Sequence, residues 1–288
     1  MPQVGFGTYQ TGGYECFDAV QEALNAGYRH IDTAMAYENE AVVGRAIDES
    51  TVNRDEIFLT TKIKGYPELL EHDRLLEAAE GCLKRLDTSY IDLLLIHWWN
   101  PESDMRETFR AMDELVDAGK VRNIGVSNFS VDQLRSAMQV ADAPIRTNQV
   151  EYHPYWKQKE ILKFCQENDV VLTAYSPLAE GRLVNDDVLQ EISERYDKTP
   201  AQVAIRWLIQ HENVVTIPKS VTPEYIRENI DVFDFALSDR EVTRIDELEG
   251  PFMYRHNREG GLLYRARGIA GPIAGRVAPN SLLGMLRS

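Results

Sequence analysis

Cysteine is scarce in this chain, and long apolar runs are missing. The 288 residues include three cysteines, none in a C-x-x-C pair: Cys16, Cys82 and Cys165. This spacing argues against a disulfide framework and a zinc site, so we expect no metal centre and a reducing, cytoplasmic location. The opening MPQVGFGTYQ lacks the basic and apolar regions of a signal peptide, and no run approaches the ~18 apolar residues of a membrane span.

Basic residues are also few relative to acidic ones. Lys and Arg total 31 against 46 Asp and Glu, which gives a net charge of −15. Such a surface repels phosphate backbones, so we expect no nucleic-acid partner. Only nine of the basic residues are lysine, and a carboxylate-rich surface suits a protein that stays hydrated in high salt. We hypothesise a halophilic source, which loss of structure in low-salt buffer would support and indifference to salt would contradict.

Eight short apolar or β-branched runs recur along the chain. They cover residues 4–9, 30–34, 57–62, 91–97, 123–128, 147–152, 170–176 and 214–220. The runs do not alternate cleanly between apolar and polar residues, as expected of parallel strands covered on both faces. The segments between them carry the 3.6-residue apolar period of helices.

The helix ends agree with this division. Ser130 and Thr199 stand at N-cap positions, and Gly27 and Gly119 stand where a helix C-terminus needs positive φ. Eight strand–helix units predict an α/β fold, a single-domain (β/α)8 TIM barrel over residues 1–250. The competing doubly wound sheet requires a turn with three glycines after its first strand, and this chain offers two.

The last 38 residues differ in charge from the rest. Residues 251–288 hold six Arg and one Glu, a local charge of 6 − 1 = +5, and form an Arg-rich C-terminal extension. Three interpretations are open: disorder or docking on the acidic barrel, a subunit contact, and a membrane-surface role. Gly271, Pro272 and Pro279 would interrupt a long amphipathic helix, which counts against the membrane. We expect a monomer or a weak homo-oligomer.

Polar residues stand at the C-terminal ends of the predicted strands, where barrels of this kind place their active sites. Asp32 lies in the second run, Lys62 ends the third and His97 ends the fourth. A charged residue beside a barrel core needs a partner, so Asp32 and Lys62 are expected to pair. Tyr37, five residues after Asp32, lies on the loop above them and is the candidate proton donor.

The expected chemistry follows from this group. An ammonium within ~4 to 6 Å favours a phenolate, so we expect Lys62 to lower the pKa of Tyr37 from its usual ~10. Tyr37 could then protonate a developing alkoxide while His97 hydrogen-bonds the same oxygen. A carbonyl that gains this proton must also gain a hydride, which requires a cofactor. An alternative is a lyase that forms a Schiff base on Lys62, but Asp32 would keep that amine charged.

The motifs around these residues resemble those of the aldo-keto reductases. Between Val4 and Asp246 they are GFGTYQ, GYRHIDTAMAYENE, FLTTKI, LLLIHW, GKVRNIGVSNF, NQVEYHPY, AYSPLAEG and IPKSVTPEYIRENIDVFDF. The resemblance implies a catalytic tetrad made of Asp32, Tyr37, Lys62 and His97. It further implies NAD(P)H-dependent reduction of small aldehydes or ketones, such as sugar-derived or 2-oxo carbonyls.

The same resemblance implies the residues of the cofactor and substrate sites. Those at the nicotinamide carboxamide are Ser127, Asn128 and Gln149, with Tyr175 stacked on the ring and Gly7 and Thr8 nearby. Those farther along the cofactor are Ser176 and Leu178 at the pyrophosphate, Lys219 and Ser220 at the adenosine 2′-phosphate, and Glu228 and Asn229 near the adenine. Tyr9 and Trp98 would form walls of the substrate pocket.

One position departs from the family pattern. The segment that usually reads K-S-x-T-P-E-R ends here in Tyr225, so an arginine at the 2′-phosphate is missing. NADPH is still the expected cofactor because Lys219 is kept, and NADH is possible because a bidentate cation is lost. A further alternative is a non-catalytic, nucleotide-binding regulatory subunit like the family's potassium-channel β subunits, against which the intact tetrad argues.

Overall fold

The computed structural model describes residues 1–250, and the Arg-rich extension lies outside the described residues. Eight parallel strands follow one another in chain order within a single sheet. They are β1 (Phe6–Gly7), β2 (His30–Asp32), β3 (Phe58–Ile63), β4 (Leu93–Ile96), β5 (Ile124–Ser127), β6 (Ile145–Glu151), β7 (Val171–Tyr175) and β8 (Val214–Thr216). Val4 bridges Thr216, and the Gly7 amide donates to the Pro218 carbonyl at 3.0 Å, which joins the first strand to the last. The predicted (β/α)8 barrel is confirmed.

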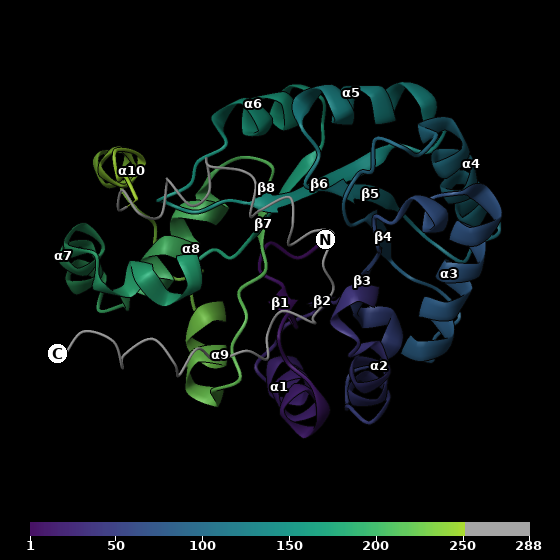
Figure 1. Cartoon of the computed structure of the whole chain (residues 1–288). Coiled ribbons are helices and arrows are strands. Elements are labelled where there is room, and N and C mark those ends of the chain that lie inside the picture. The colour runs from purple at the N-terminus through teal and green to yellow at the C-terminus, as the bar shows by residue number, and fades with distance from the viewer. Residues whose placement is uncertain (251–288) are drawn as a thin grey trace, which may run out of the picture. The chain divides into compact units, whose positions relative to one another are not determined.

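Helices surround these strands (Figure 1). The α-helices of residues 1–250 are α1 (Gly13–Asn25), α2 (Glu40–Asp48), α3 (His72–Leu86), α4 (Met105–Asp117), α5 (Val131–Val140), α6 (Lys159–Glu167), α7 (Asp187–Tyr196), α8 (Pro200–Gln210), α9 (Pro223–Ile230) and α10 (Asp239–Asp246). Short 3-10 turns are η1 (Met35–Tyr37), η2 (Arg54–Glu56), η3 (Pro67–Leu69) and η4 (Ala179–Asn185).

The predicted helix ends are confirmed. Ser130 caps α5 and Thr199 caps α8, each in a reciprocal capping box with a glutamine three residues later. Gly27 and Gly119 have φ values of 102° and 69°, the left-handed region that glycine enters at no steric cost. Local chemistry therefore fixes where these helices begin and end.

The strands are in the predicted places and most are shorter than predicted, although β6 begins two residues earlier, at Ile145. β8, for example, ends at Thr216, whereas the apolar run extends to residue 220. β4 is buried along its whole length, and each fully buried leucine or isoleucine contributes about 1.5 to 3 kcal/mol to stability. The core between strands and helices therefore holds the strand ends in fixed positions.

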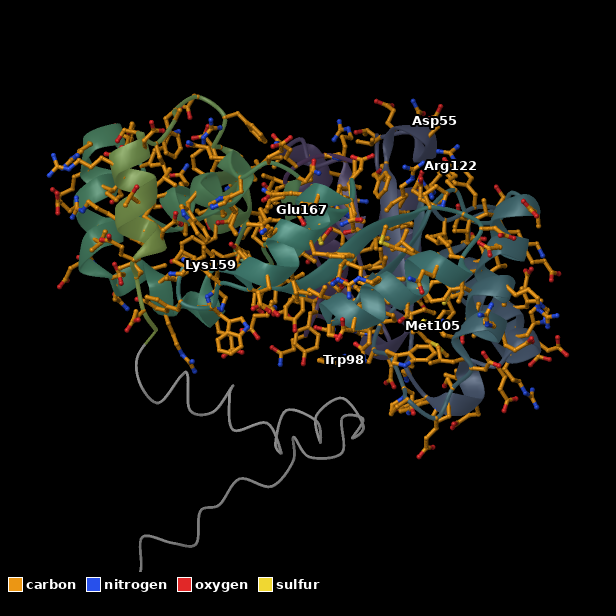
Figure 2. The ribbon with its side chains drawn as sticks, turned by 90° about the horizontal axis from the view of Figure 1, so that it is seen from above. Asp55, Trp98, Met105, Arg122, Lys159 and Glu167 are labelled. Carbon is orange, nitrogen blue, oxygen red and sulfur yellow. The ribbon has the colours of Figure 1, made fainter. Side chains whose placement is uncertain are left out.

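The two ends of the barrel lie at opposite edges of Figure 2. Trp98, which follows β4, projects at one edge, and Arg122, which precedes β5, lies at the other edge near Asp55. Because all eight strands are parallel, the Trp98 edge carries the C-terminal ends of the strands and the loops that follow them. The candidate site is expected at that edge.

His30 makes the stability of the barrel depend on pH. It is 1% exposed, with Nε2 3.1 Å from the Thr60 hydroxyl. Burial, together with the charge of Lys62, lowers the pKa of His30 from 6.5 to about 3. Between pH 6.5 and about pH 3, His30 therefore binds a proton in the unfolded chain but not in the folded chain. The free energy of unfolding decreases as the pH falls through this window.

We expect the lowered pKa of His30 to reduce the free energy of unfolding by about 2 kcal/mol between pH 7 and pH 5. Urea unfolding of the wild type and of His30→Gln at both pH values measures the effect. The variant should show a shallower loss of unfolding free energy with acid, whatever its absolute stability. Identical pH slopes for the two proteins would contradict the assignment to His30.

Candidate active site

A buried ion pair joins the ends of two neighbouring strands. Lys62 Nζ on β3 lies 2.5 Å from Asp32 Oδ1 on β2 and donates to the Thr33 carbonyl at 2.8 Å. Lys62 is 0% and Asp32 1% exposed. Burial raises the pKa of Asp32 and lowers that of Lys62, and the attraction between the two charges opposes both shifts. The predicted pairing is confirmed, and each charge offsets the cost of burying the other.

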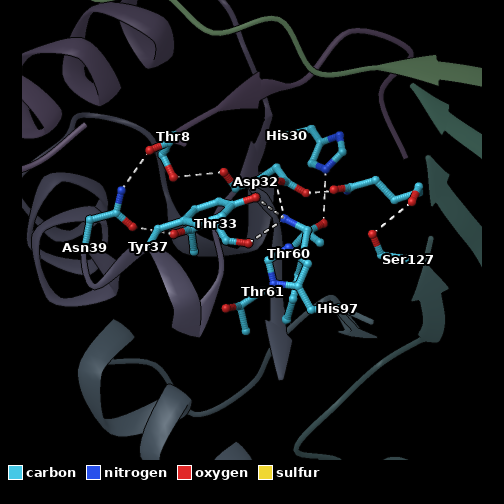
Figure 3. Close-up of polar contacts among 12 residues, drawn as sticks. Thr8, His30, Asp32, Thr33, Tyr37, Asn39, Thr60, Thr61, His97 and Ser127 are labelled. Carbon is cyan, nitrogen blue, oxygen red and sulfur yellow. Dashed lines mark hydrogen bonds and ion pairs between the residues drawn. The ribbon is translucent and has the colours of Figure 1, made fainter. Parts of the chain in front are cut away.

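Gln149 holds the second oxygen of this carboxylate. Its Nε2 donates to Asp32 Oδ2 at 2.7 Å from β6, across 117 residues of sequence. Figure 3 shows Asp32 within the network of polar contacts. Both carboxylate oxygens are therefore fixed, which orients Asp32 toward Lys62. The sequence motif suggested only a cofactor contact for Gln149 and gave no sign of this contact.

Tyr37 lies next to the ammonium, as predicted. Its hydroxyl is 3.4 Å from Lys62 Nζ, and the ammonium lies 5.0 Å from the ring centroid. The predicted lowering of the Tyr37 pKa is wrong: burial raises this pKa well above 10.0, and the Asp32 carboxylate adds to the increase. Burial of the phenol is the main reason, and the nearby Asp32 carboxylate opposes ionisation as well, so the positive charge of Lys62 does not prevail. Tyr37 is therefore held in the protonated form, the form that a proton donor requires.

Asn39 fixes the loop that carries Tyr37. Its side chain is 1% exposed; Oδ1 accepts from the Thr33 hydroxyl at 2.7 Å, and Nδ2 donates to the Thr8 carbonyl at 2.8 Å and to the Thr11 carbonyl at 3.1 Å. One amide thus joins the loops after β1 and β2 around Tyr37 (Figure 3). Asn39 was not among the predicted site residues, although a polar amide two positions after the candidate acid was a visible signal.

Glu40 anchors the same loop from the outer side of the sheet. It is 1% exposed, at the start of α2, and accepts from the Thr61 hydroxyl at 2.5 Å and from Arg85 on α3 at 2.7 Å. Thr61 precedes Lys62, and Glu40 follows Tyr37 by three residues. The strand that carries the ammonium and the loop that carries the phenol are therefore tied together by a buried carboxylate.

His97 faces Tyr37 from the end of β4. The two rings are 5.8 Å apart in an edge-to-face arrangement. Burial lowers the pKa of His97 to about 3, and the charges of Lys62 and Lys64 act in the same direction. The imidazole is therefore neutral near pH 7 and has one N–H to donate.

Residues at the C-terminal ends of β5, β6 and β7 form a second hydrogen-bonded group. The Ser127 hydroxyl donates to the Gln149 carbonyl at 2.9 Å, and Asn128 Nδ2 donates to the His97 carbonyl at 3.1 Å. The Tyr175 hydroxyl donates to Asn128 Oδ1 at 3.0 Å. Asn128 holds a φ of 61°, an unusual value for a residue other than glycine, and such values cluster at functional sites. The structure thus brings these four predicted residues together beside the tetrad.

Other predicted residues lie along the rim of this group. Thr8 donates to the Asp32 carbonyl at 3.0 Å. Gly7 allows β1 to approach β8, because a Cβ there would lie 2.9 Å from the Ile217 carbonyl oxygen. Tyr9 is 56% exposed, with its ring 5.1 Å from that of Tyr37, and Trp98 is half-buried.

The remaining predicted residues lie on the loops after β7 and β8 and on α9, outside the network of Figure 3. Ser176 and Leu178 follow β7, and Ser176 has a φ of 50°. Lys219 is exposed and Ser220 half-buried after β8, while Asn229 is buried within α9 next to half-buried Glu228. The structure therefore brings the tetrad and the carboxamide group together and leaves the predicted adenosine residues on a separate segment.

Residues 1–250 also bear on two other classes of site, membrane spans and metal centres. No helix in that part of the chain combines the length and the apolar character needed to cross a membrane. The same residues contain no group of three or more His, Cys, Asp or Glu side chains that could hold a metal ion. The cytoplasmic location, the halophilic source and the oligomeric state stay predictions.

Comparison with known proteins gives consistent matches. The model of the Aldo/keto reductase family matches residues 3–249. An aldo-keto reductase of Mycolicibacterium smegmatis is 46% identical over 254 residues, 86% of this chain and 90% of the relative. A glyoxal reductase of Bacillus subtilis is 44% identical over 250 residues, 86% of this chain and 89% of the relative. The crystal structure of an aldo-keto reductase from a Medee basin deep-sea metagenome is 43% identical, covers 86% of this chain and 92% of its own, and has a TM-score of 0.83.

Proposed function

The chain belongs to the aldo/keto reductase family, and from that premise we propose that it reduces small aldehydes and ketones to alcohols with NADPH. The observation that carries the proposal is the contact of 3.4 Å between the Tyr37 hydroxyl and Lys62 Nζ, with Asp32 behind the lysine. A protonated phenol beside a buried, fixed cation is suited to donating a proton to a carbonyl oxygen. The similarity to a glyoxal reductase supports a small carbonyl substrate.

The chain's side chains fit a nicotinamide cofactor. A carboxamide has one donor group and one acceptor, and Ser127, Asn128 and Gln149 offer hydroxyl and amide groups of both kinds within one connected group. Tyr175 would provide the aromatic face, and Lys219 with Ser220 would meet the 2′-phosphate. When bound, NADPH would supply the hydride that the carbonyl carbon needs.

The chain's own residues would handle the proton. Tyr37 would donate its hydroxyl proton to the carbonyl oxygen as negative charge develops there, and neutral His97 would donate a hydrogen bond to the same oxygen. Lys62 would stabilise the phenolate left on Tyr37, because the two atoms already lie 3.4 Å apart. Asp32, held by Gln149, would keep Lys62 in place. No covalent bond to the enzyme is needed.

Steady-state assays with both cofactors and a panel of small aldehydes and ketones test this function. NADPH oxidation that depends on the aldehyde is the expected result. Binding of nucleotide without turnover would favour a regulatory subunit instead. Trapping of substrate on Lys62 by borohydride, without any cofactor, would favour the Schiff-base lyase.

Tyr225 should weaken discrimination between the two cofactors. It is 57% exposed in the first turns of α9, after the Lys219–Ser220 segment, and a phenol cannot replace a bidentate guanidinium at a phosphate. Tyr225→Arg is therefore expected to raise the NADPH-to-NADH ratio of kcat/KM by about tenfold, the value of one charge-assisted hydrogen bond of about 1.5 kcal/mol. A wild-type ratio at or below one would overturn the preference for NADPH, and an unchanged ratio in the variant would remove position 225 from the phosphate site.

A further inference from the structure

Lys64 is a second lysine at the mouth of the candidate site. It directly follows β3 and stands two positions after Lys62. Side chains two apart on a strand share a face, so Lys64 continues the face of the sheet from which Lys62 reaches Asp32. Lys64 is therefore one step nearer the open end of the barrel than the catalytic ammonium.

The neighbouring chain segment at this point is the one that carries His97. Ile63 on β3 pairs with Ile96 on β4, and the His97 amide donates to the Ile63 carbonyl at 2.9 Å. In this parallel register, Lys64 lies beside His97. Gly65, the next residue, packs so closely on the Trp98 carbonyl that a Cβ would have no room. Lys64 is thus held beside the two residues that border the reacting carbonyl.

The charge of Lys64 has no counter-ion in the described part of the chain. The lysine is half-buried, and the contact recorded for its ammonium within residues 1–250 is with the Tyr66 ring, 6.0 Å away. Lys62, by contrast, is neutralised by Asp32, and Lys198 is paired with Asp231 and Asp234. Lys64 thus places an uncompensated ammonium beside the candidate catalytic histidine in a chain of net charge −15. Its field reaches the imidazole, since the charge of Lys64 contributes to the lowered pKa of His97.

We propose that Lys64 binds a carboxylate carried by the substrate, so that the enzyme prefers aldehydes and ketones that bear a carboxylate over their neutral counterparts. The inference rests on the proposed carbonyl reduction and adds a substrate class to it. A carboxylate is favoured over a phosphate because one ammonium balances one negative charge, whereas a phosphate monoester carries nearly two beside the buried Asp32. The Lys64 ammonium acts as a point charge, so the contact would discriminate between substrates by their charge more than by their shape.

The test compares two aldehydes of nearly equal size. These are 4-carboxybenzaldehyde and its neutral counterpart 4-formylbenzamide, assayed with NADPH and with NADH. The wild type is expected to favour the carboxylate in kcat/KM by about fivefold, mainly through KM, as for a partly exposed ion pair. The preference should shrink as salt is raised toward 1 M. Lys64→Met should bring the ratio close to one, and Lys64→Arg should restore it.

Lys84 supplies the matched control. It is an exposed lysine in the last turn of α3, at the opposite end of the barrel from the strand C-termini. Lys84→Met removes the same charge from the whole molecule and should keep the wild-type ratio. Equal ratios in the wild type and in Lys64→Met, or a wild-type preference for the amide, would overturn the proposal while leaving carbonyl reduction intact. Turnover of neither aldehyde with either cofactor would instead overturn the proposed function, and this inference with it.

Discussion

Tyr37→Phe is expected to lower kcat by about 10²- to 10⁴-fold, the usual contribution of a positioned proton donor. The substitution removes one hydroxyl and keeps the ring, which packs 5.1 Å from Tyr9 and 5.8 Å from His97. The ring face toward Lys62 Nζ is also kept. The structural change is therefore confined to the atom that would carry the transferred proton.

Kinetics can separate this chemical effect from a binding effect. NADPH affinity, followed by fluorescence titration, should be largely kept, while kcat and kcat/KM should fall together. Tyr14→Phe is a suitable control, because Tyr14 is 82% exposed on α1 and loses the same hydroxyl group. If Tyr37→Phe turned over aldehydes at the wild-type rate, Tyr37 would have to be removed from its role.

The barrel and the ion pair at its mouth could be predicted from the sequence for a shared physical reason. Parallel strands bring their C-terminal ends to one edge, so polar residues that end consecutive strands must meet there. Asp32 and Lys62 are such residues, and burial obliges two opposite charges to pair. Capping is similarly local, which is why Ser130 and Gly27 marked the helix ends correctly.

Contacts that depend on crossing the barrel could not be predicted in this way. The bond from Gln149 to Asp32 spans 117 residues and depends on side-chain direction inside the barrel. The amide of Asn39 joins two loops whose relative position is set only after the strands have packed. No local pattern in the sequence specifies either contact.

The pKa of Tyr37 shows most clearly what a linear pattern omits. The predicted pKa rested on the positive charge of Lys62 alone, without the burial of the phenol or the negative charge of Asp32. Each of these opposes ionisation of Tyr37, and together they reverse the predicted direction. Proximity of a cation is therefore not enough to lower the pKa of a phenol when burial and a neighbouring carboxylate act in the opposite direction.

Lys62→Met tests whether this pair supports the fold as well as the chemistry. Removing one partner of a buried ion pair leaves an uncompensated charge and costs about 3 to 5 kcal/mol. We expect urea unfolding at pH 7 to show a loss of this size, together with loss of reductase activity. Without Lys62, burial still raises the pKa of Asp32 above its unfolded value of about 3.8.

The sign of the pH dependence follows from that raised pKa. As the pH falls through it, the folded variant takes up a proton on Asp32 before the unfolded chain does, so the stability deficit shrinks with acid. The double variant Asp32→Asn with Lys62→Met removes the stranded charge, and it should recover most of the stability at pH 7 while remaining inactive. A single variant as stable as the wild type at pH 7 would mean that the pair contributes nothing to the fold. Recovery of activity in the double variant would mean that the ammonium has no chemical role, because stability would then account for the whole effect of Lys62.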